Sequence, residues 1–143
     1  MPDSRPISYP AGYVTSTAVG FADPVGNLSL VSAASALPVV QTRSAAPAAL
    51  AGQTSGSLLA GPFAPLRDVP IHLQLSGTWV GTVTVVRSAD GGATRQSLTV
   101  GGQPWGKYTA NANEVVWQEG EVGATFYLDI ALTSGSVAYR VSQ

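Results

Sequence analysis

Residues 124–132 read ATFYLDIAL, and this stretch decides the fold class. Apolar residues recur in it at every second position, which is the signal of a β-strand with one buried face. The residues of the buried phase are Ala124, Phe126, Leu128, Ile130 and Leu132. We therefore expect a strand here whose apolar phase faces a hydrophobic core.

Outward from this stretch, the C-terminal half of the chain repeats the pattern in short segments. They lie at residues 71–75, 79–87, 94–100, 114–118 and 137–141. Residues that favour turns separate them, namely Asp90-Gly91-Gly92, Gly101-Gly102, Glu119-Gly120 and Ser134-Gly135-Ser136. Six or seven short strands without a helix predict an all-β domain over residues 66–143, a small antiparallel β-sandwich of immunoglobulin-like or jelly-roll-like form.

One register follows if residues 133–136 form a four-residue hairpin loop. Leu132 then faces Val137, and counting back places Asp129 directly opposite Arg140. Opposite charges at facing positions of an antiparallel pair contribute roughly 0.2–1 kcal/mol. We predict an Asp129–Arg140 cross-strand pair on the outer face.

The first 65 residues differ in composition from the rest. They contain 8 Pro, 13 Ala and 9 Ser but only four charged side chains. Proline lacks a backbone donor and fixes φ, so long helices and central strands are excluded. Because Ala and Ser bury little apolar surface, this half cannot build its own core. We expect residues 1–65 to be an extended arm that becomes ordered through its contacts with other subunits. The alternative is a flexible low-complexity tail.

Composition excludes several kinds of chemistry. The 143 residues include one His and no Cys, which rules out a disulfide framework, a thiolate metal site and a multi-His metal centre. A net charge of −1 without a basic cluster argues against nucleic-acid binding. The start of the chain lacks the pattern of a secretory signal, and no apolar run approaches the ~18 residues of a membrane helix. We expect neither nucleic acid nor membrane as a partner.

Residues 88–94 read SADGGAT and resemble the Asp-box turn of sialidase propellers. An Asp carboxylate can bond backbone N–H groups of its own turn, and glycine supplies positive φ. Arg95 takes the position of the usual closing aromatic. We predict a structural turn rather than a catalytic or calcium site, formed by Ser88, Asp90, Gly91, Gly92 and Thr94.

Residues 101–108 form a loop with two aromatics and the only lysine of the chain. The residues of interest are Pro104, Trp105, Lys107 and Tyr108. Two interpretations stay open: Trp105 and Tyr108 stack on a sugar ring, or Trp105 packs against the end of the sandwich or a neighbouring subunit.

The remaining candidates for catalysis are few. Any Ser-His-Asp triad would need His72, and the chain has no Gly-x-Ser-x-Gly motif. A pair among Glu114, Glu119 and Glu121 could serve glycoside hydrolysis, but Glu119 and Glu121 flank Gly120 in an expected turn. We expect a surface or interface histidine, solvated loop carboxylates, no enzyme activity and no cofactor or metal.

Residues 70–143 resemble a group of small virion proteins of tailed bacteriophages and prophages. The segments that carry the resemblance are LSGTWVGTV (75–83), RSADGGAT (87–94), PWG (104–106), YTAN (108–111) and TSGSVAYRV (133–141). The resemblance implies a non-enzymatic structural subunit of the phage particle.

A charge-poor arm beside one sandwich suits a capsid-decorating, or cement, protein that bridges neighbouring subunits. We expect other virion proteins as partners, above all the major capsid protein, together with homo-oligomers. The expected location is the virion, assembled in the bacterial host cytoplasm. The alternatives are a tail or neck structural protein and a carbohydrate-binding or host-adhesion module.

Overall fold

The computed structural model describes residues 19–40 and 44–143. The chain divides into two compact units, residues 1–43 and 44–143. The all-β class is confirmed, since the described residues contain strands and no helix, and every strand pair is antiparallel. The strands are β1 (Gly20–Ala22), β2 (Leu28–Leu30), β3 (Leu50–Thr54), β4 (Leu58–Phe63), β5 (Pro70–Ser88), β6 (Gln96–Ser97), β7 (Thr99–Val100), β8 (Gln103–Pro104), β9 (Lys107–Tyr108), β10 (Ala112–Gln118) and β11 (Thr125–Ser142).

The expected boundary at residue 65 is wrong. Strands β3 and β4, which the composition assigned to the arm, both pair with β11 in the sheet of the second unit. They form its edge, where Pro62 of β4 is tolerated because an edge strand needs no donor on its outer side. The Pro/Ala/Ser-rich composition therefore continues into the sandwich, and residues 1–18 of the expected arm lie outside the described residues.

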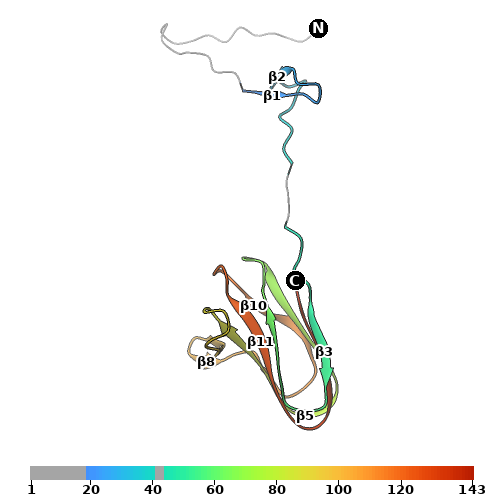
Figure 1. Cartoon of the computed structure of the whole chain (residues 1–143), viewed down its shortest axis with the longest axis vertical. Coiled ribbons are helices and arrows are strands. Elements are labelled where there is room, and N and C mark those ends of the chain that lie inside the picture. Colours follow the sequence, from blue (N-terminus) through green and yellow to red (C-terminus); the bar gives the residue numbers. More distant parts are fainter. Residues whose placement is uncertain (1–18, 41–43) are drawn as a thin grey trace. The chain divides into compact units, whose positions relative to one another are not determined.

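One sheet folds over to make the sandwich. Strands β5 and β11 pair along nearly their whole length, from Ser88 with Thr125 to His72 with Ser142. Strand β3 pairs with the second half of β11, and β4 pairs with its first half. The long ribbon turns over at the lower end of this unit in Figure 1, where β5 is labelled.

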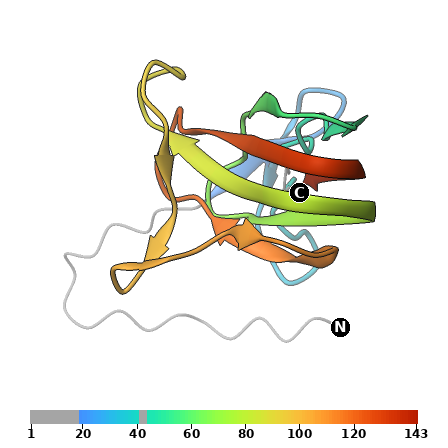
Figure 2. The same ribbon diagram turned by 90° about the horizontal axis from the view of Figure 1, so that it is seen from below.

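Each long strand thus contributes to both layers. One layer contains β10, the first half of β5, the second half of β11 and β3. The other contains β6 and β9, the second half of β5, the first half of β11 and β4. Figure 2 shows β5 in yellow-green beside β11 in red, with the yellow-to-orange segment projecting from the sheet.

Glycines make the bend possible. Gly81 and Gly135 have φ values of 144° and 83°, a region that favours glycine. A Cβ atom at Gly81 would lie against the carbonyl oxygen of Ala131, and one at Gly135 against that of Thr78. The register also shifts by one residue between Leu132 and Ser134. Here glycine marks a bulge and a close backbone approach within continuous strands.

The predicted Asp129–Arg140 pair is wrong for the same reason. Residues 133–136 form no hairpin loop but continue β11, so both charges lie on one strand. Asp129 faces Thr84 of β5, whereas Arg140 faces Gln74 in the other layer.

The core lies between the two layers. The buried phase predicted for residues 71–75 and 124–132 is confirmed at most positions, while Leu132 near the bend is only partly buried. The core cluster comprises Ala60, Phe63, Ile71, Leu73, Leu75, Val83, Val85, Leu98, Val116, Phe126, Leu128, Ile130, Val137 and Val141. Both halves of β5 and β11 supply it, which ties the two layers together.

Candidate functional site

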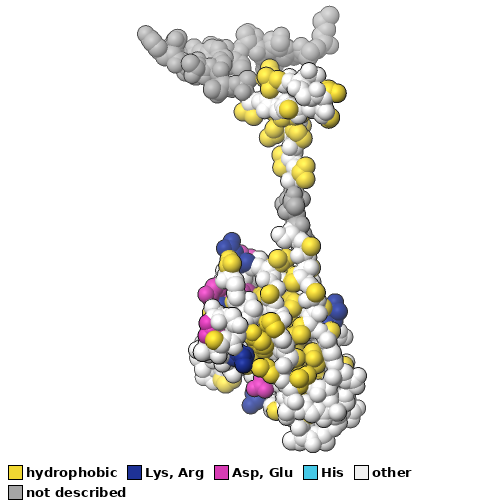
Figure 3. Space-filling view, in the orientation of Figure 1, with side chains coloured by type: hydrophobic (Ala, Val, Ile, Leu, Met, Phe, Trp, Pro, Cys, Tyr) yellow, Lys and Arg dark blue, Asp and Glu magenta, His cyan; other side chains and the backbone are white. Residues whose placement is uncertain are grey.

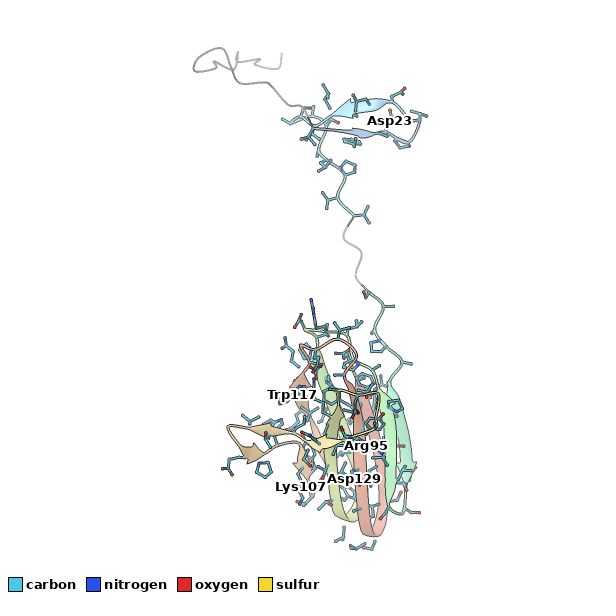
Figure 4. All side chains as sticks on the ribbon, turned by 60° about the vertical axis from the view of Figure 1, so that its left-hand side comes forward. Asp23, Arg95, Lys107, Trp117 and Asp129 are labelled. Atoms are coloured by element: carbon cyan, nitrogen blue, oxygen red, sulfur yellow. The ribbon has the colours of Figure 1, made fainter. Side chains whose placement is uncertain are left out.

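A projecting hairpin, β7–β8, is inserted between β6 and β9 and carries the aromatic loop. The turn is Gly101-Gly102, with positive φ at both glycines. The base of the hairpin is anchored by Leu98, which is buried and accepts a hydrogen bond from the Trp105 backbone N–H at 2.9 Å. Figure 4 shows the hairpin standing away from the sheet, with Lys107 near its base.

Gly106 fixes the direction of the two side chains that flank it. Its carbonyl accepts a hydrogen bond from the Val85 N–H at 2.8 Å. A Cβ atom here would approach the side chains of Val85, Leu98 and Val116 to within 3.2–3.4 Å. The buried glycine therefore lies on the core while its neighbours Trp105 and Lys107 remain exposed.

Trp105 links the two layers. Its indole N–H donates to the Val116 carbonyl at 2.7 Å. Val116 is the extra residue of a bulge in β10, so its carbonyl is outside the ladder with β5. Trp105 as a whole remains 43% exposed. The indole N–H bond supports the interpretation that Trp105 packs against the sandwich. The exposed part of the residue leaves the interpretation of a sugar contact open.

Tyr108 makes a second contact between the layers. Its hydroxyl donates to Glu114 Oε1 of β10 at 2.8 Å. Partial burial, reinforced by this carboxylate, raises the pKa of the Tyr108 phenol well above its ordinary value. Tyr108 pairs with Val83, whose side chain is in the core, and so lies on the inner side of its strand. Its ring packs partly against the core, and Tyr108 also lines a small surface hollow with Trp105.

Three hollows surround the hairpin base. The first, of about 270 Å³, is lined by Arg87, Ala89, Thr94, Gln96, Ser97, Leu98, Thr99 and Trp117. The second, of about 280 Å³, is lined by Thr84, Ser97, Leu98, Thr99, Pro104, Trp105 and Lys107. The third, of about 150 Å³, is lined by residues 104–108 and Glu114. The lining residues place Trp105 and Lys107 at both the second and the third hollow.

The Asp90 turn bonds within itself. The Asp90 carboxylate accepts the Thr94 N–H at 2.9 Å and the Thr94 hydroxyl at 2.6 Å. The Ser88 hydroxyl donates to Asp90 at 2.7 Å and accepts the Gly92 N–H at 2.8 Å. These bonds, those from Thr94 first, hold the pKa of Asp90 far below its ordinary value. The Asp90 carboxylate therefore stabilises the turn through its bonds to Ser88 and Thr94.

Arg95 has a role of its own in this turn. Its guanidinium carbon lies 5.2 Å from the ring centroid of Tyr127, and its Nη1 donates to the Gly92 carbonyl at 2.6 Å. The residue that replaces the closing aromatic of the Asp-box pattern thus lies over an aromatic ring from β11. This contact fastens the turn to the outer face of the sheet.

An ion pair at the open end of the sandwich was not predicted. Arg87 Nε donates to Glu119 Oε2 at 2.6 Å and Nη2 donates to Oε1 at 3.1 Å, a bidentate pair. A further bond joins Arg87 to Glu121. Glu119 is only 4% exposed, so the expectation of solvated loop charges is wrong for this residue. The hydrogen bond from Arg87 lowers the pKa of Glu119.

A sequence signal for this pair exists in hindsight. Arg87 continues the inner phase of β5 after Val83 and Val85, so its side chain is largely buried, with 25% of it exposed. A charge in such a position needs a buried partner of opposite sign. That partner is Glu119, which directly follows β10. The other two candidates, Glu114 and His72, are exposed, and His72 faces Val115 and Ser142 on the neighbouring strands.

The structure brings some of the candidate residues together and separates others. The turn around Asp90 and the base of the β7–β8 hairpin meet at the first hollow, through Thr94 and Ser97. Within residues 19–40 and 44–143, no group of three or more His, Cys, Asp and Glu side chains is arranged to hold a metal ion. Nor do these ranges contain a helix long and apolar enough to cross a membrane.

Searches with protein-family models, among curated proteins and among solved structures found no match to the chain.

Proposed function

We propose that this chain is a structural, non-enzymatic component of a tailed-bacteriophage particle, in which it decorates the capsid and bridges neighbouring subunits. The resemblance of residues 70–143 to small virion proteins leads to this class. The observation that carries the bridging role is the exposed apolar surface of residues 19–40.

Residues 19–40 form a small β1–β2 hairpin without a core. Its turn is well bonded: Asp23 Oδ1 accepts the N–H groups of Val25 and Asn27 at 3.0 and 2.8 Å. The large apolar side chains nevertheless remain exposed, as the yellow atoms on this segment show in Figure 3. They are Val19, Val25, Leu28, Leu30, Val31, Leu37, Val39 and Val40, exposed by 39–84%.

A partner surface would supply what this segment lacks. An isolated two-stranded hairpin is marginally stable at best in water. Soluble proteins rarely leave a large contiguous apolar surface uncovered unless it is an interaction site. The one charge among residues 19–40, Asp23, is engaged in the turn. Docking would bury the apolar side chains without desolvating an unpaired charge, which suits an assembly contact.

Copy number in the particle tests the proposal. Particles are purified from the bacterial host that encodes the chain, and the chain is quantified against the major capsid protein by mass spectrometry. We expect a copy number that matches the capsid lattice. A handful of copies would overturn decoration in favour of a tail or neck position, and absence from the particle would overturn the virion role.

The bridging role has its own test. Leu28 and Leu30 lie on one face of the hairpin, so the double variant Leu28→Ser/Leu30→Ser should reduce retention on particles. The sandwich should melt unchanged, because the hairpin belongs to the other unit. Val122→Ser is the matched control, since Val122 is 79% exposed but lies in the sandwich. Equal retention of both variants would contradict a docking role for residues 19–40.

A further inference from the structure

The second hollow at the hairpin base has the features of a small ligand site. Its volume is about 280 Å³, and it lies between the β7–β8 hairpin and the outer side of β5. Pockets that hold drug-sized ligands measure ~300–1,000 Å³ and combine an apolar wall with a few polar groups. A hollow just below that range suits a single ring-sized unit.

The apolar wall is held in place by the fold. The Trp105 indole N–H is bonded to the Val116 carbonyl, and the Trp105 backbone N–H is bonded to Leu98. The first bond holds the edge of the ring and the second holds the backbone that carries it, while Trp105 stays 43% exposed. A ring fixed before binding loses little conformational freedom when a ligand stacks on it. Pro104 extends the same wall.

The polar groups of the hollow are of two kinds. Thr84, Ser97 and Thr99 contribute hydroxyls, each of which can both donate and accept a hydrogen bond. Lys107 contributes a cation, and no carboxylate lines this hollow. The neighbouring hollow of about 150 Å³ lacks this net positive charge, because both Lys107 and the Glu114 carboxylate line it.

From this arrangement we infer that the hollow binds a uronic-acid unit of an acidic polysaccharide. The apolar face of the sugar ring stacks on Trp105, its hydroxyls bond to Thr84, Ser97 and Thr99, and its carboxylate pairs with Lys107. A neutral sugar would meet the same wall and hydroxyls but would leave Lys107 unpaired. The site therefore favours the acidic unit. This activity does not rest on the assembly role proposed above.

Binding by the full-length isolated protein tests the inference. The probes are oligosaccharides that contain glucuronic, galacturonic or mannuronic acid and their neutral counterparts, measured by saturation-transfer NMR and calorimetry. We expect binding of at least one acidic oligomer, with affinity falling about tenfold or more in Trp105→Ala because an aromatic anchor is lost. Lys107→Met should weaken the acidic oligomer toward the affinity of its neutral counterpart.

Two further variants separate ligand contacts from damage to the hairpin. Thr99→Val keeps the shape of the strand and removes one hydroxyl of the hollow, so it should weaken binding. Val100→Ala is the matched control, because Val100 is exposed in the same hairpin and does not line the hollow. It should bind like the wild type.

Three results would overturn the inference. They are failure of every acidic oligomer to bind, equal affinity for acidic and neutral oligomers, and binding that survives both Trp105→Ala and Lys107→Met. Since the isolated protein is used, these results are independent of whether the chain is found in phage particles.

Discussion

The two ends of the sandwich are held by different kinds of interaction. At the folded end, backbone meets backbone: Gly81 and Gly135 lie so close to the facing strand that a side chain would strike a carbonyl oxygen. At the open end, a side-chain contact links the two layers, namely the bidentate pair of Arg87 with Glu119. The folded end tolerates no added atom, whereas the open end depends on charge.

This difference separates geometry from chemistry within one fold. The bend exists because β5 and β11 change layer at one level, which requires glycine conformations and a register shift. At the open end the chain crosses between the layers in the connections at residues 64–69 and 119–124, and the Arg87–Glu119 pair adds a side-chain link between them. Changes at the folded end should therefore affect whether the chain folds, and changes at the open end should affect how stable it is.

The largest effect is expected at the folded end. Gly135→Ala should destabilise the sandwich by more than about 4 kcal/mol, because a methyl group would strike the Thr78 carbonyl at a positive φ. Total stabilities of about 5–15 kcal/mol leave little after such a loss. Expression in the soluble fraction and thermal unfolding by circular dichroism measure the effect.

Gly123→Ala is the control for this variant. Gly123 has a φ of 86°, close to the 83° of Gly135, but nothing lies within 4 Å of its virtual Cβ. It should lose only the ~1 kcal/mol cost of a positive φ. Equal losses at both glycines would show that close approach does not determine the bend.

At the open end, Glu119→Gln should cost about 3 kcal/mol, since it removes the buried carboxylate of the bidentate pair and leaves Arg87 with only the exposed Glu121 as a charged partner. The chain should still fold. Urea unfolding measures the difference, and Glu121→Gln is the control because that side chain is 57% exposed. A larger loss of stability from Glu121→Gln than from Glu119→Gln would show that Glu121 is the main partner of Arg87.

The same pair should make the open end sensitive to acid. Its hydrogen bond from Arg87 lowers the pKa of Glu119 below the ordinary 4.5. The stability that Glu119 contributes is therefore complete above pH 4.5 and is lost as the pH falls through the lowered pKa. Melting temperatures of the wild type and Glu119→Gln should converge in acid. Because Asp90 also has a lowered pKa, the test is this difference and not the wild-type curve alone.

A smaller effect is expected beside the open end, at the link between Trp105 and β10. Trp105→Phe keeps an aromatic ring but removes the donor to the Val116 carbonyl, which should cost about 1 kcal/mol. Hydrogen exchange should quicken in β10 and stay unchanged near Gly81. Unchanged exchange in β10 would mean that the indole N–H does not hold this edge.

The smallest effect concerns the two charges on β11. Asp129→Asn and Arg140→Gln should be additive in a double-mutant cycle to within about 0.5 kcal/mol, because the two residues lie in different layers. A coupling above this value would restore the hairpin register in place of the bend.

The pattern of apolar residues predicted the class and most of the core because alternation reports directly which side of a strand is buried. It did not predict the bend, because glycine has the same sequence signature in a turn and in a bulge. Ser134-Gly135-Ser136 reads as a hairpin turn, yet it pairs with residues 78–80 of β5. Only the partner strand decides between these possibilities.

The candidate site was predicted unevenly for a related reason. The Asp90 turn is local, with its bonds spanning two to four residues, so its residues were identifiable. The Arg87–Glu119 pair spans 32 residues and depends on the layers meeting. The hollow beside Trp105 likewise needs segments 84, 97–99 and 104–107 to converge, which no local pattern encodes.

The sharing of β5 and β11 between layers has a consequence for how the protein folds and unfolds. Both layers share the same two central strands, so one layer cannot fold completely before the other begins to form. Zipping from the Ser88–Thr125 pair toward the His72–Ser142 pair has to carry the chain around the bend before the core closes. Such distant pairings fold slowly. Once closed, the sandwich should melt as one cooperative unit, with no populated state in which a single layer survives.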